Sequence, residues 1–399
     1  MRSASGSDGD LDAATPANHP VIWSGSDRSD GVITLDNDRR VGLAQFGRPT
    51  GHPVIWCHGG LSSRIDAALA GGAAARNDIR LIALDRPGIG RSSPAPGDGL
   101  LRWPGVVAEC ADHLGLNTFG VAGWSAGGPY ALACAYLLAG RVTATATVAG
   151  IYPVSDAARR RELGLALDRG LIRLSRRAPR TARLLLEAVR IAPDDVLWRA
   201  TQHGGGPAER AALVPEIRPT VLRMVREAVR QGTAGIVTDY RTVGSDWGFP
   251  PDVIAAPVTV WQGEDDGLVP VGHGERLADE LRAGTLVRVP HAGHYMHASH
   301  GELIMSGLCA PRRPKPGRGT GHSGGSLAVA AVAASDRIRD MIEPRYPNRW
   351  FGSNPQAVTS QGKKLSAFPR DLPKDWRSAL GLDDAVSAAE RSSGATAPK

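Results

Sequence analysis

Short apolar segments alternate with longer segments of helical spacing through the first part of the chain. Each apolar segment is followed by turn residues, and this pattern is typical of buried strands in a parallel sheet. The predicted buried strands are Pro53–Cys57, Ile79–Asp85, the segment that opens at Phe119, and Val142–Ala149. Helical spacing occurs near Ile65–Ala75 and in Trp103–Leu114. Ahead of these, two segments around Asn37-Asp38 predict an antiparallel hairpin, namely Gly31–Asp36 and Arg40–Gln45.

The pattern changes after Tyr152-Pro153. From about residue 155 to residue 244 only helical spacing occurs, with predicted helices at Arg161–Leu174, Arg180–Ile191 and Ile217–Gln231. The alternation then resumes with strands Pro257–Trp261 and Leu286–Val289, and with helices Gly274–Arg282 and Ser299–Leu308. This order predicts an α/β fold whose sheet is mostly parallel, with helices on both faces. The helical block between two strands predicts a cap over the carboxyl edge of the sheet, where such folds bind ligands.

Composition separates both ends of the chain from this pattern. Residues 1–30 are rich in Ser, Asp, Gly and Pro, and they predict a flexible N-terminal segment. Residues 311–399 begin with a basic Pro/Gly-rich stretch and lack regular apolar periodicity, so they predict a disordered tail. Between the ends, we predict a sheet-forming core in residues 31–153 and 247–310 and a helical cap in residues 154–246.

The net charge of +7 belongs to the tail. Residues 311–399 carry this entire excess and all five lysines of the 399-residue chain. The charge therefore gives no reason to expect that the folded part binds nucleic acid. A small-molecule partner is the expectation that remains, and the oligomeric state stays open.

Cysteine usage and the N-terminus bear on the compartment. Cys57, Cys110, Cys134 and Cys309 are far apart and form no C-x-x-C pair, so they predict buried thiols of a reducing compartment, with a disulfide as the alternative. The N-terminus contains no apolar signal segment, and the longest apolar run, Leu327–Ala334, is too short to span a bilayer. The sequence predicts a cytoplasmic protein without a membrane span.

The candidate nucleophile is Ser125, within Gly123-Trp124-Ser125-Ala126-Gly127. A strand precedes this G-x-S-x-G sequence and an Ala/Leu-rich helix follows it. The turn between them would place the serine hydroxyl free of both elements, with glycines that let the backbones approach closely. The N–H of Ala126 would begin the helix, where unpaired amides can bind a developing oxyanion.

A serine nucleophile needs a histidine base and a carboxylate that orients the histidine. Two loops follow later predicted strands, at Gln262–Pro270 and at Pro290–His294. The first loop offers Glu264, Asp265 and Asp266 as acids, and the second offers His291 and His294 as bases. The chain order of serine, acid and histidine is the order that an α/β-hydrolase requires.

From about Val32 to Leu308 the chain resembles the α/β-hydrolase superfamily in its capped form. Five motifs carry the resemblance: the HGG sequence at His58–Gly60, D-R-P-G-x-G-x-S at Asp85–Ser92, the serine turn, G-x-x-D-x-x-V-P at Gly263–Pro270, and Gly293-His294. The resemblance implies Ser125 as nucleophile, Asp266 as orienting acid and His294 as general base. It also implies that the amides of Gly60 and Ala126 form the oxyanion hole, and that His58 fixes this loop.

Several other residues admit a second interpretation. Histidines recur at three-residue steps at His291, His294, His297 and His300, which could suggest a metal site. Such spacing brings ligands together only on a helix, and this segment is predicted to be a loop that leads into a helix. A second G-x-S-x-G sequence occurs at Gly321–Gly325, but no strand precedes it, so Ser323 is rejected as nucleophile. Trp247 and Phe249 either line the pocket or pack the return of the cap.

These residues together predict a serine hydrolase that cleaves an ester of a small or medium carboxylic acid, with no cofactor and no metal. A serine at the turn argues against relatives that displace halide or open epoxides, because those use an aspartate there. Two alternatives remain open. One is cleavage of an activated C–C bond by the same residues, and the other is a ligand-binding role without catalysis.

Overall fold

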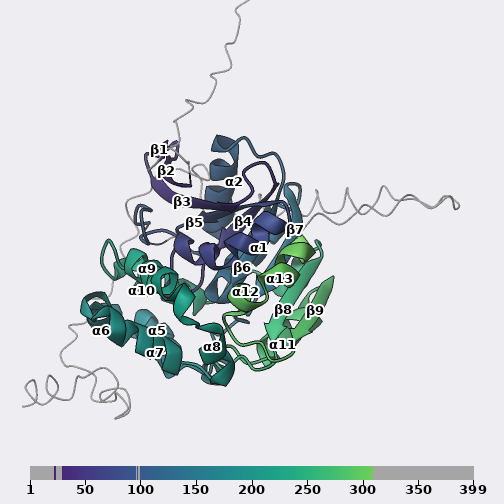
Figure 1. The fold of residues 1–399 in the computed structure, drawn as a ribbon. Helices are drawn as coiled ribbons and strands as arrows, with labels where there is room; N and C mark the ends of the chain where they lie inside the picture. The colour runs from purple at the N-terminus through teal and green to yellow at the C-terminus, as the bar shows by residue number, and fades with distance from the viewer. Residues whose placement is uncertain (1–21, 24–28, 96, 98, 309–399) are drawn as a thin grey trace, which may run out of the picture.

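The computed structural model describes residues 22–23, 29–95, 97 and 99–308. Within these residues, nine strands form one sheet in the order β1-β2-β3-β5-β4-β6-β7-β8-β9 (Figure 1). The strands are β1 Ile22–Trp23, β2 Asp30–Thr34, β3 Arg40–Gly47, β4 His52–Cys57, β5 Ile79–Leu84, β6 Phe119–Trp124, β7 Val142–Val148, β8 Val258–Gly263 and β9 Gly284–Val289. Pairing is antiparallel from β1 to the β3–β5 pair and parallel from β5 through β9. The predicted mostly parallel α/β sheet is confirmed.

The two faces of the sheet are covered by different helices. In β4, Ile55 and Cys57 belong to a core with α2 (Trp103–His113) and α3 (Gly128–Leu137). Val54 and Trp56 point to the other face and pack with α1 (Gly71–Arg76) and α13 (Gly301–Leu308). Successive residues of a strand face opposite sides, so a run of apolar residues fits a strand covered on both faces. The remaining helices of the sheet region are η1 Arg64–Ala70, η2 Leu100–Arg102, η3 Ser125–Gly127, α11 Gly272–Glu280 and α12 Met296–Ser299.

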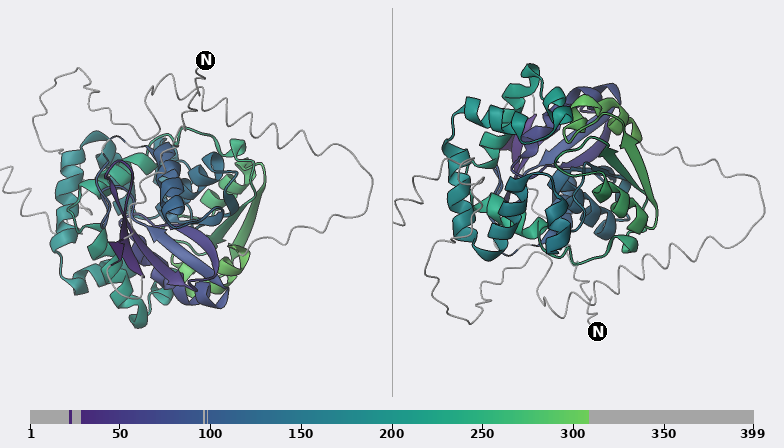
Figure 2. Two further views of the ribbon diagram at one scale, coloured as in Figure 1. Left: turned by 90° about the horizontal axis from the view of Figure 1, so that it is seen from above. Right: turned by 90° about the horizontal axis from the view of Figure 1, so that it is seen from below.

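A helical insertion separates β7 from β8. Its α-helices are α4 Ala157–Glu162, α5 Ala166–Arg177, α6 Pro179–Ile191, α7 Asp194–His203, α8 Pro207–Ala212, α9 Arg218–Ala228 and α10 Ala234–Val243. Short 3-10 turns occur at η4 Pro215–Ile217 and η5 Pro251–Val253. Views from above and below show the insertion helices gathered at one side of the sheet (Figure 2).

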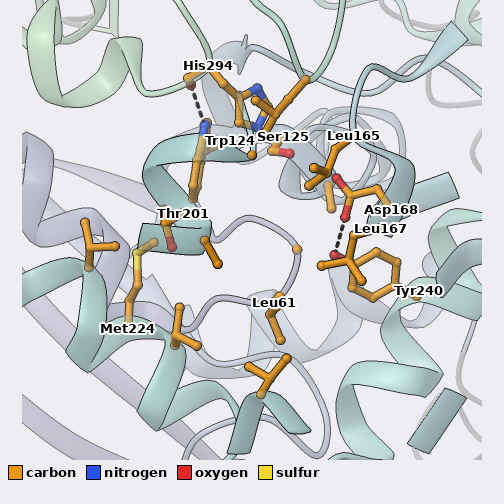
Figure 3. A pocket seen from close by; sticks show the side chains of 18 of the residues that line it. Leu61, Trp124, Ser125, Leu165, Leu167, Asp168, Thr201, Met224, Tyr240 and His294 are labelled. Carbon is orange, nitrogen blue, oxygen red and sulfur yellow. Dashed lines mark hydrogen bonds between the residues drawn. The ribbon is translucent and has the colours of Figure 1, made fainter. Parts of the chain in front are cut away.

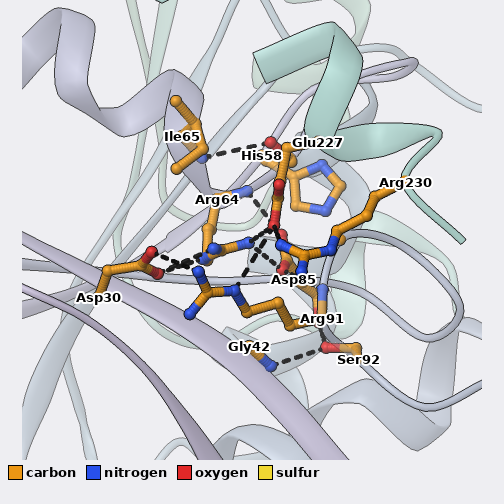
Figure 4. A network of polar contacts seen from close by, with 12 residues as sticks. Asp30, Gly42, His58, Arg64, Ile65, Asp85, Arg91, Ser92, Glu227 and Arg230 are labelled. Carbon is orange, nitrogen blue, oxygen red and sulfur yellow. Dashed lines mark hydrogen bonds and ion pairs between the residues drawn. The ribbon is translucent and has the colours of Figure 1, made fainter. Parts of the chain in front are cut away.

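A buried ion-pair cluster fastens the insertion to the sheet (Figure 4). Glu227 of α9 pairs with Arg64 over 2.8 Å, and Arg64 also pairs with Asp85 over 2.6 Å. Asp30 of β2 completes the set with a 2.8 Å contact to Arg64. Arg64 is 1% exposed, so removing one acid would leave part of a buried charge unpaired, which is strongly destabilising. The position of α9 over the sheet is therefore fixed by charge as well as by apolar packing.

Sequence patterning located the strands better than the helices of the insertion. The prediction of one helix over Arg161–Leu174 is wrong, because α4 ends at Glu162 and α5 begins at Ala166. At the break, the N–H of Gly164 donates to the carbonyl of Leu268, and a Cβ on Gly164 would lie 1.7 Å from the oxygen of Gly267. The chain leaves the helix there because it must approach the loop after β8.

Other details also differ from the expectations. The helices α7, α8 and α10 were not predicted as separate elements, and the short α12 precedes the last predicted helix, which corresponds to α13. Trp247 and Phe249 are buried in the core, where Phe249 stacks on Tyr136 with 5.2 Å between ring centroids, so they pack and do not line the pocket.

Three of the four cysteines, Cys57, Cys110 and Cys134, are buried and free. Most of the N-terminal segment 1–30, the tail 311–399, Cys309 and Ser323 lie outside the described residues. Among the residues that the structure describes, no helix is long and apolar enough to cross a membrane. The predicted divisions at residues 153, 246 and 310 stay predictions.

Candidate active site

Ser125 stands on a strained turn between β6 and α3. Its φ is +54°, a left-handed conformation that is costly for a residue with a Cβ. Glycine is required on both sides of it. A Cβ on Gly123 would lie 2.1 Å from the carbonyl oxygen of Gly127, and a Cβ on Gly127 would lie 2.0 Å from that of Cys57. The G-x-S-x-G spacing therefore has a steric cause here, and the turn presents Ser125 to a cavity.

Asp266 and His294 form a hydrogen-bonded pair. Nδ1 of His294 lies 3.0 Å from Oδ2 of Asp266, and both side chains are buried. The other carboxylate oxygen of Asp266 accepts hydrogen bonds from the N–H groups of Leu268 and Val269, over 2.9 and 2.8 Å. The carboxylate is thus fixed by its own loop and presents one oxygen to the imidazole. With Nδ1 bound in this way, a neutral imidazole has Nε2 free to accept a proton.

The neighbouring acids of the same loop do not reach His294. The contact of Asp265 is with His291, whose side chain is 95% exposed, over 3.7 Å. Glu264 is exposed to solvent. Geometry therefore pairs Asp266 with His294, as the motif register implies.

Electrostatics and packing also set the state of His294. Burial favours the neutral imidazole, but the charge of Asp266 and its hydrogen bond outweigh burial and raise the pKa of His294 above its ordinary value. The Trp124 indole Nε1–H donates to the carbonyl of His294 over 2.9 Å, and the two rings lie 5.3 Å apart. The residue next to Ser125 therefore holds the loop that carries the histidine.

The loop after β4 brings Gly60 beside Ser125. A Cβ on Gly60 would lie 3.5 Å from the Cβ of Ala126, and both residues line the same cavity as Ser125 and His294. Asp66 holds this loop by accepting hydrogen bonds from Gly59 N–H, Ser62 Oγ and Trp56 Nε1, each over 2.9 Å. Burial raises the pKa of Asp66 to about 6, although these donors act against the rise.

Arg86, from the D-R-P-G segment, supports the same loop from behind. Its guanidinium donates to the carbonyl oxygens of His58 and Gly59. It also forms a bidentate ion pair with Asp239 of α10, in which both contacts measure 2.7 Å. His58 lies inside this arrangement. Its Nε2 accepts from the Arg86 N–H over 3.2 Å, and its Nδ1 lies 2.8 Å from the Gly59 carbonyl oxygen. Burial lowers the pKa of His58 well below its ordinary value, so this ring stays neutral and serves the loop.

The cavity that Ser125 lines has a volume of about 190 Å³ (Figure 3). One end of it is lined by Gly60, Ser125, Ala126 and His294, and most of the other lining residues come from the helical insertion. The walls are largely apolar, including Leu61, Leu165, Leu167, Val225 and Leu268. A mostly apolar cavity with a few converging polar groups is the usual form of a small-molecule site.

The other histidines of the same segment have no place in the cavity wall. His297 is fully buried between Trp56 and Trp124, with ring centroids 5.8 and 4.4 Å away. Within the described part of the chain, no group of three or more His, Cys, Asp or Glu residues could hold a metal ion.

Sequence reasoning missed several residues that shape this site. Asp168 of α5 and Tyr240 of α10 line the cavity, and Glu209 of α8 lies buried behind the histidine loop. No motif marks these residues, because all three lie in the helical insertion. Arg86 was visible only as part of the D-R-P-G match.

Comparison with known proteins agrees with this architecture. A model of the alpha/beta hydrolase family matches residues 54–306, which is more than half of the chain. The protein therefore belongs to the alpha/beta hydrolase family. No curated protein sequence matches the chain.

Solved structures show the same fold at low sequence identity. A hydrolase from Pseudomonas aeruginosa PA01 is 16% identical, with a TM-score of 0.54 over 71% of this chain and 97% of that chain. An esterase from Thermogutta terrifontis is 20% identical, with a TM-score of 0.53 over 69% of this chain and 95% of that chain. The enol-lactonase from Burkholderia xenovorans LB400 is 19% identical, with a TM-score of 0.50 over 69% and 96% of the two chains. Identities this low establish similarity of fold alone.

Proposed function

We propose that the protein is a serine hydrolase that cleaves an ester of a small or medium carboxylic acid through an acyl-enzyme on Ser125. One observation carries the proposal. Ser125, on its strained turn, opens into the same cavity as His294, and His294 is paired with a buried Asp266. These are the three groups of a nucleophile, a base and an orienting acid, supplied in the chain order of an α/β-hydrolase.

The reaction follows from the roles of these groups. Nε2 of His294 takes the Ser125 proton as the hydroxyl oxygen attacks the ester carbonyl, and the imidazolium then protonates the departing alcohol. A water molecule, activated by the same imidazole, hydrolyses the acyl-enzyme. Asp266 holds the tautomer that leaves Nε2 free, and its charge stabilises the imidazolium. These steps use only side chains and water.

The amides of Gly60 and Ala126 are the proposed donors to the oxyanion. Removing one such donor typically costs about 10² to 10³ in kcat, so the fixed loop around Gly60 is a substantial part of the proposed catalysis. The anchors of that loop are Asp66, which accepts from the N–H of Gly59, and Arg86, which donates to the carbonyl oxygen of Gly59.

The cavity supports an ester of limited size. Its volume of about 190 Å³ and its apolar walls suit a short acyl or alcohol group. The esterase and the enol-lactonase of the same fold agree with cleavage at an ester carbonyl.

The test is labelling of the full chain with a serine-directed fluorophosphonate, followed by mass spectrometry of the labelled peptide. We expect the label on Ser125 and its loss in Ser125→Ala. Ser323→Ala is the matched control, because it alters the other G-x-S-x-G sequence. Hydrolysis of p-nitrophenyl esters of increasing acyl length then measures the size limit of the cavity. A folded protein that neither takes the label nor hydrolyses any of these esters would overturn the proposal and favour a ligand-binding role.

A further inference from the structure

An acidic side chain stands in the wall of the apolar cavity. Asp168 lies in the first turn of α5, and its Oδ1 accepts a hydrogen bond from the Tyr240 hydroxyl of α10 over 2.7 Å (Figure 3). Both residues line the cavity that contains Ser125 and His294. The pair is separate from Asp266, which serves the histidine.

Asp168 accepts fewer hydrogen bonds than the other acids around the site. Asp66 and Glu209 are fully buried, and each accepts three hydrogen bonds. Asp168 is half-buried and accepts one hydrogen bond within the described part of the chain, from Tyr240. The second oxygen of Asp168 is not among the buried side-chain atoms that lack a hydrogen-bond partner, so it is accessible from the cavity that Asp168 lines. The second oxygen of Asp168 is therefore available to a molecule in the cavity.

The electrostatics of the cavity favour a partner for that oxygen. Burial raises the pKa of the Asp168 carboxyl, although the hydrogen bond from Tyr240 and the positive charge of a protonated His294 act in the opposite direction. A donor supplied by a ligand would stabilise the charged form in the same way as Tyr240 does.

The Asp168–Tyr240 pair lies beside the loop that carries Gly60. A Cβ on Gly60 would lie 3.1 Å from the Tyr240 hydroxyl, so Tyr240 borders the proposed oxyanion site. An unneutralised carboxylate nearby would oppose negative charge that develops on the substrate carbonyl. A protonated amino group on the substrate, between Asp168 and the carbonyl, would offset this negative charge, and a hydroxyl that donates to Asp168 would reduce its effect.

We propose that Asp168, oriented by Tyr240, binds a hydroxyl or protonated amino group of the substrate, so that the protein selects esters carrying a hydrogen-bond donor near the scissile bond. This inference rests on the proposed esterase function of Ser125. The rest of the cavity wall is largely apolar and binds the hydrocarbon part of the same molecule. Sites built to accept a substrate O–H or N–H discriminate strongly against analogues that lack it, because the site's polar group is then left unpaired.

The test compares esters that differ only in the donor group. On the acyl side, p-nitrophenyl 3-hydroxybutyrate and 3-aminobutyrate are each measured against p-nitrophenyl 3-methylbutyrate. On the alcohol side, ethylene glycol monobutyrate is measured against propyl butyrate, and 2-(dimethylamino)ethyl butyrate against 3-methylbutyl butyrate. We expect kcat/KM to favour the donor ester by at least about tenfold in one of the two series. The series that shows the preference tells whether the donor lies on the acyl or the alcohol side of the ester. Comparison of the hydroxyl and amine esters tells whether the preferred donor is neutral or cationic.

Two variants assign the preference to Asp168. Asp168→Leu should reduce the ratio to about one, and Asp168→Asn should abolish a preference for the amine while keeping part of a preference for the hydroxyl. The matched control is Asp279→Asn, an exposed acid of α11. If Asp168→Leu fails to fold, Asp168→Asn and Tyr240→Phe carry the test.

The outcomes separate this inference from the proposed function. Ser125-dependent hydrolysis with no donor preference in either series, or with a preference unchanged in both Asp168 variants, overturns the inference alone. Absence of hydrolysis and of fluorophosphonate labelling in the folded protein overturns the proposed function, and this inference falls with it.

Discussion

The backbone N–H of His294 donates a hydrogen bond to Oε1 of Glu209 over 3.0 Å. Glu209 lies on α8 of the helical insertion and is fully buried. The same carboxylate accepts from the N–H of Gly267, next to Asp266, and from the N–H of Gly206. One side chain of the insertion thus holds the two loops that carry the acid and the base. The insertion that forms most of the cavity walls is thus also bound to both loops of the Asp266–His294 pair.

Replacing Glu209 should impair stability and activity together. Glu209→Ala would leave three backbone N–H groups without their acceptor, so we expect a destabilisation of roughly 3 kcal/mol. Small displacements of a catalytic base lower rates steeply, and kcat/KM on a p-nitrophenyl ester should fall by about tenfold to a hundredfold. Thermal melts and steady-state kinetics measure the two effects.

Two further variants identify the cause of the Glu209 effect. Glu209→Gln keeps an acceptor oxygen but lacks the charge, and it should lie between wild type and Glu209→Ala. Glu216→Ala removes an exposed glutamate of the same insertion and should leave both quantities unchanged. Wild-type kinetics in Glu209→Ala would show that Glu209 does not position His294.

The pH dependence of the reaction should reveal the Asp266–His294 pair. The base must be neutral, so kcat/KM should fall as pH decreases through the pKa of His294 in the free enzyme. Because Asp266 raises that pKa, the acidic limb should lie above pH 6.5, the ordinary value of a histidine. Asp266→Asn removes the charge that stabilises the imidazolium and should move the limb to lower pH. It should also reduce kcat by about 10³- to 10⁴-fold through loss of the correct tautomer. An acidic limb at the same pH in both proteins would contradict this assignment.

How far the sequence predicts this molecule depends on which part is considered. Ser125 directly follows the buried strand β6, and Asp266 and His294 lie in the loops after β8 and β9, where apolar runs and turn residues locate these loops in the chain. The structure brings Asp266 and His294 into contact and places Ser125 on the same cavity. Local pattern located these loops because the sheet dictates where each strand ends, but the choice of Asp266 over Glu264 and Asp265 came from the family motif.

The helical insertion was predicted less well for a physical reason. Its residues act through contacts between segments far apart in the sequence. Glu209 binds the loop before His294, and Gly164 interrupts a helix to reach the loop after β8. Asp168 and Tyr240 meet across α5 and α10. Helical periodicity shows which side of a helix is apolar but gives no information on which helix that side meets.

A buried neutral histidine should make the protein sensitive to acid. Burial and the nearby His294 lower the pKa of His297 to about 3, and neither ring nitrogen has a hydrogen-bond partner in the described part of the chain. In the unfolded chain the pKa of this histidine is near 6.5, so between about pH 6.5 and pH 3 the unfolded state binds a proton at His297 and the folded state does not. His297 therefore leaves the free energy of unfolding unchanged above about pH 6.5. As pH falls toward 3, it lowers that free energy, by about 2 kcal/mol at pH 5.

His297→Phe tests this reasoning, because phenylalanine can pack against Trp56 and Trp124 and cannot take up a proton. We expect the variant to lose less stability than wild type between pH 7 and pH 5, by about 2 kcal/mol in denaturant unfolding. His203→Phe, at an exposed position on α7, is the control and should follow the wild-type curve. Parallel curves for wild type and His297→Phe would show that His297 does not contribute to acid unfolding.

Arg86 should matter for the rate of the chemical step more than for substrate binding. Its buried guanidinium binds the carbonyl oxygens of His58 and Gly59 and the carboxylate of Asp239 at the same time. Lysine has the charge but lacks the planar fork, so Arg86→Lys cannot make all these contacts. The loop before Gly60 would then lose its support, and an oxyanion donor displaced from its position costs about 10² in kcat.

The division between kcat and KM tests this positioning role. Since Arg86 itself does not line the cavity, KM for a p-nitrophenyl ester should change by less than about threefold, while kcat and the rate of fluorophosphonate labelling fall together. Asp239→Asn should weaken the same support through its loss of charge and lower kcat in the same direction. Arg48→Lys, at an exposed ion pair with Asp78, is the matched control and should behave as wild type. If folded Arg86→Lys raised KM with kcat unchanged, Arg86 would act on substrate binding, and its proposed link to the oxyanion loop would be wrong.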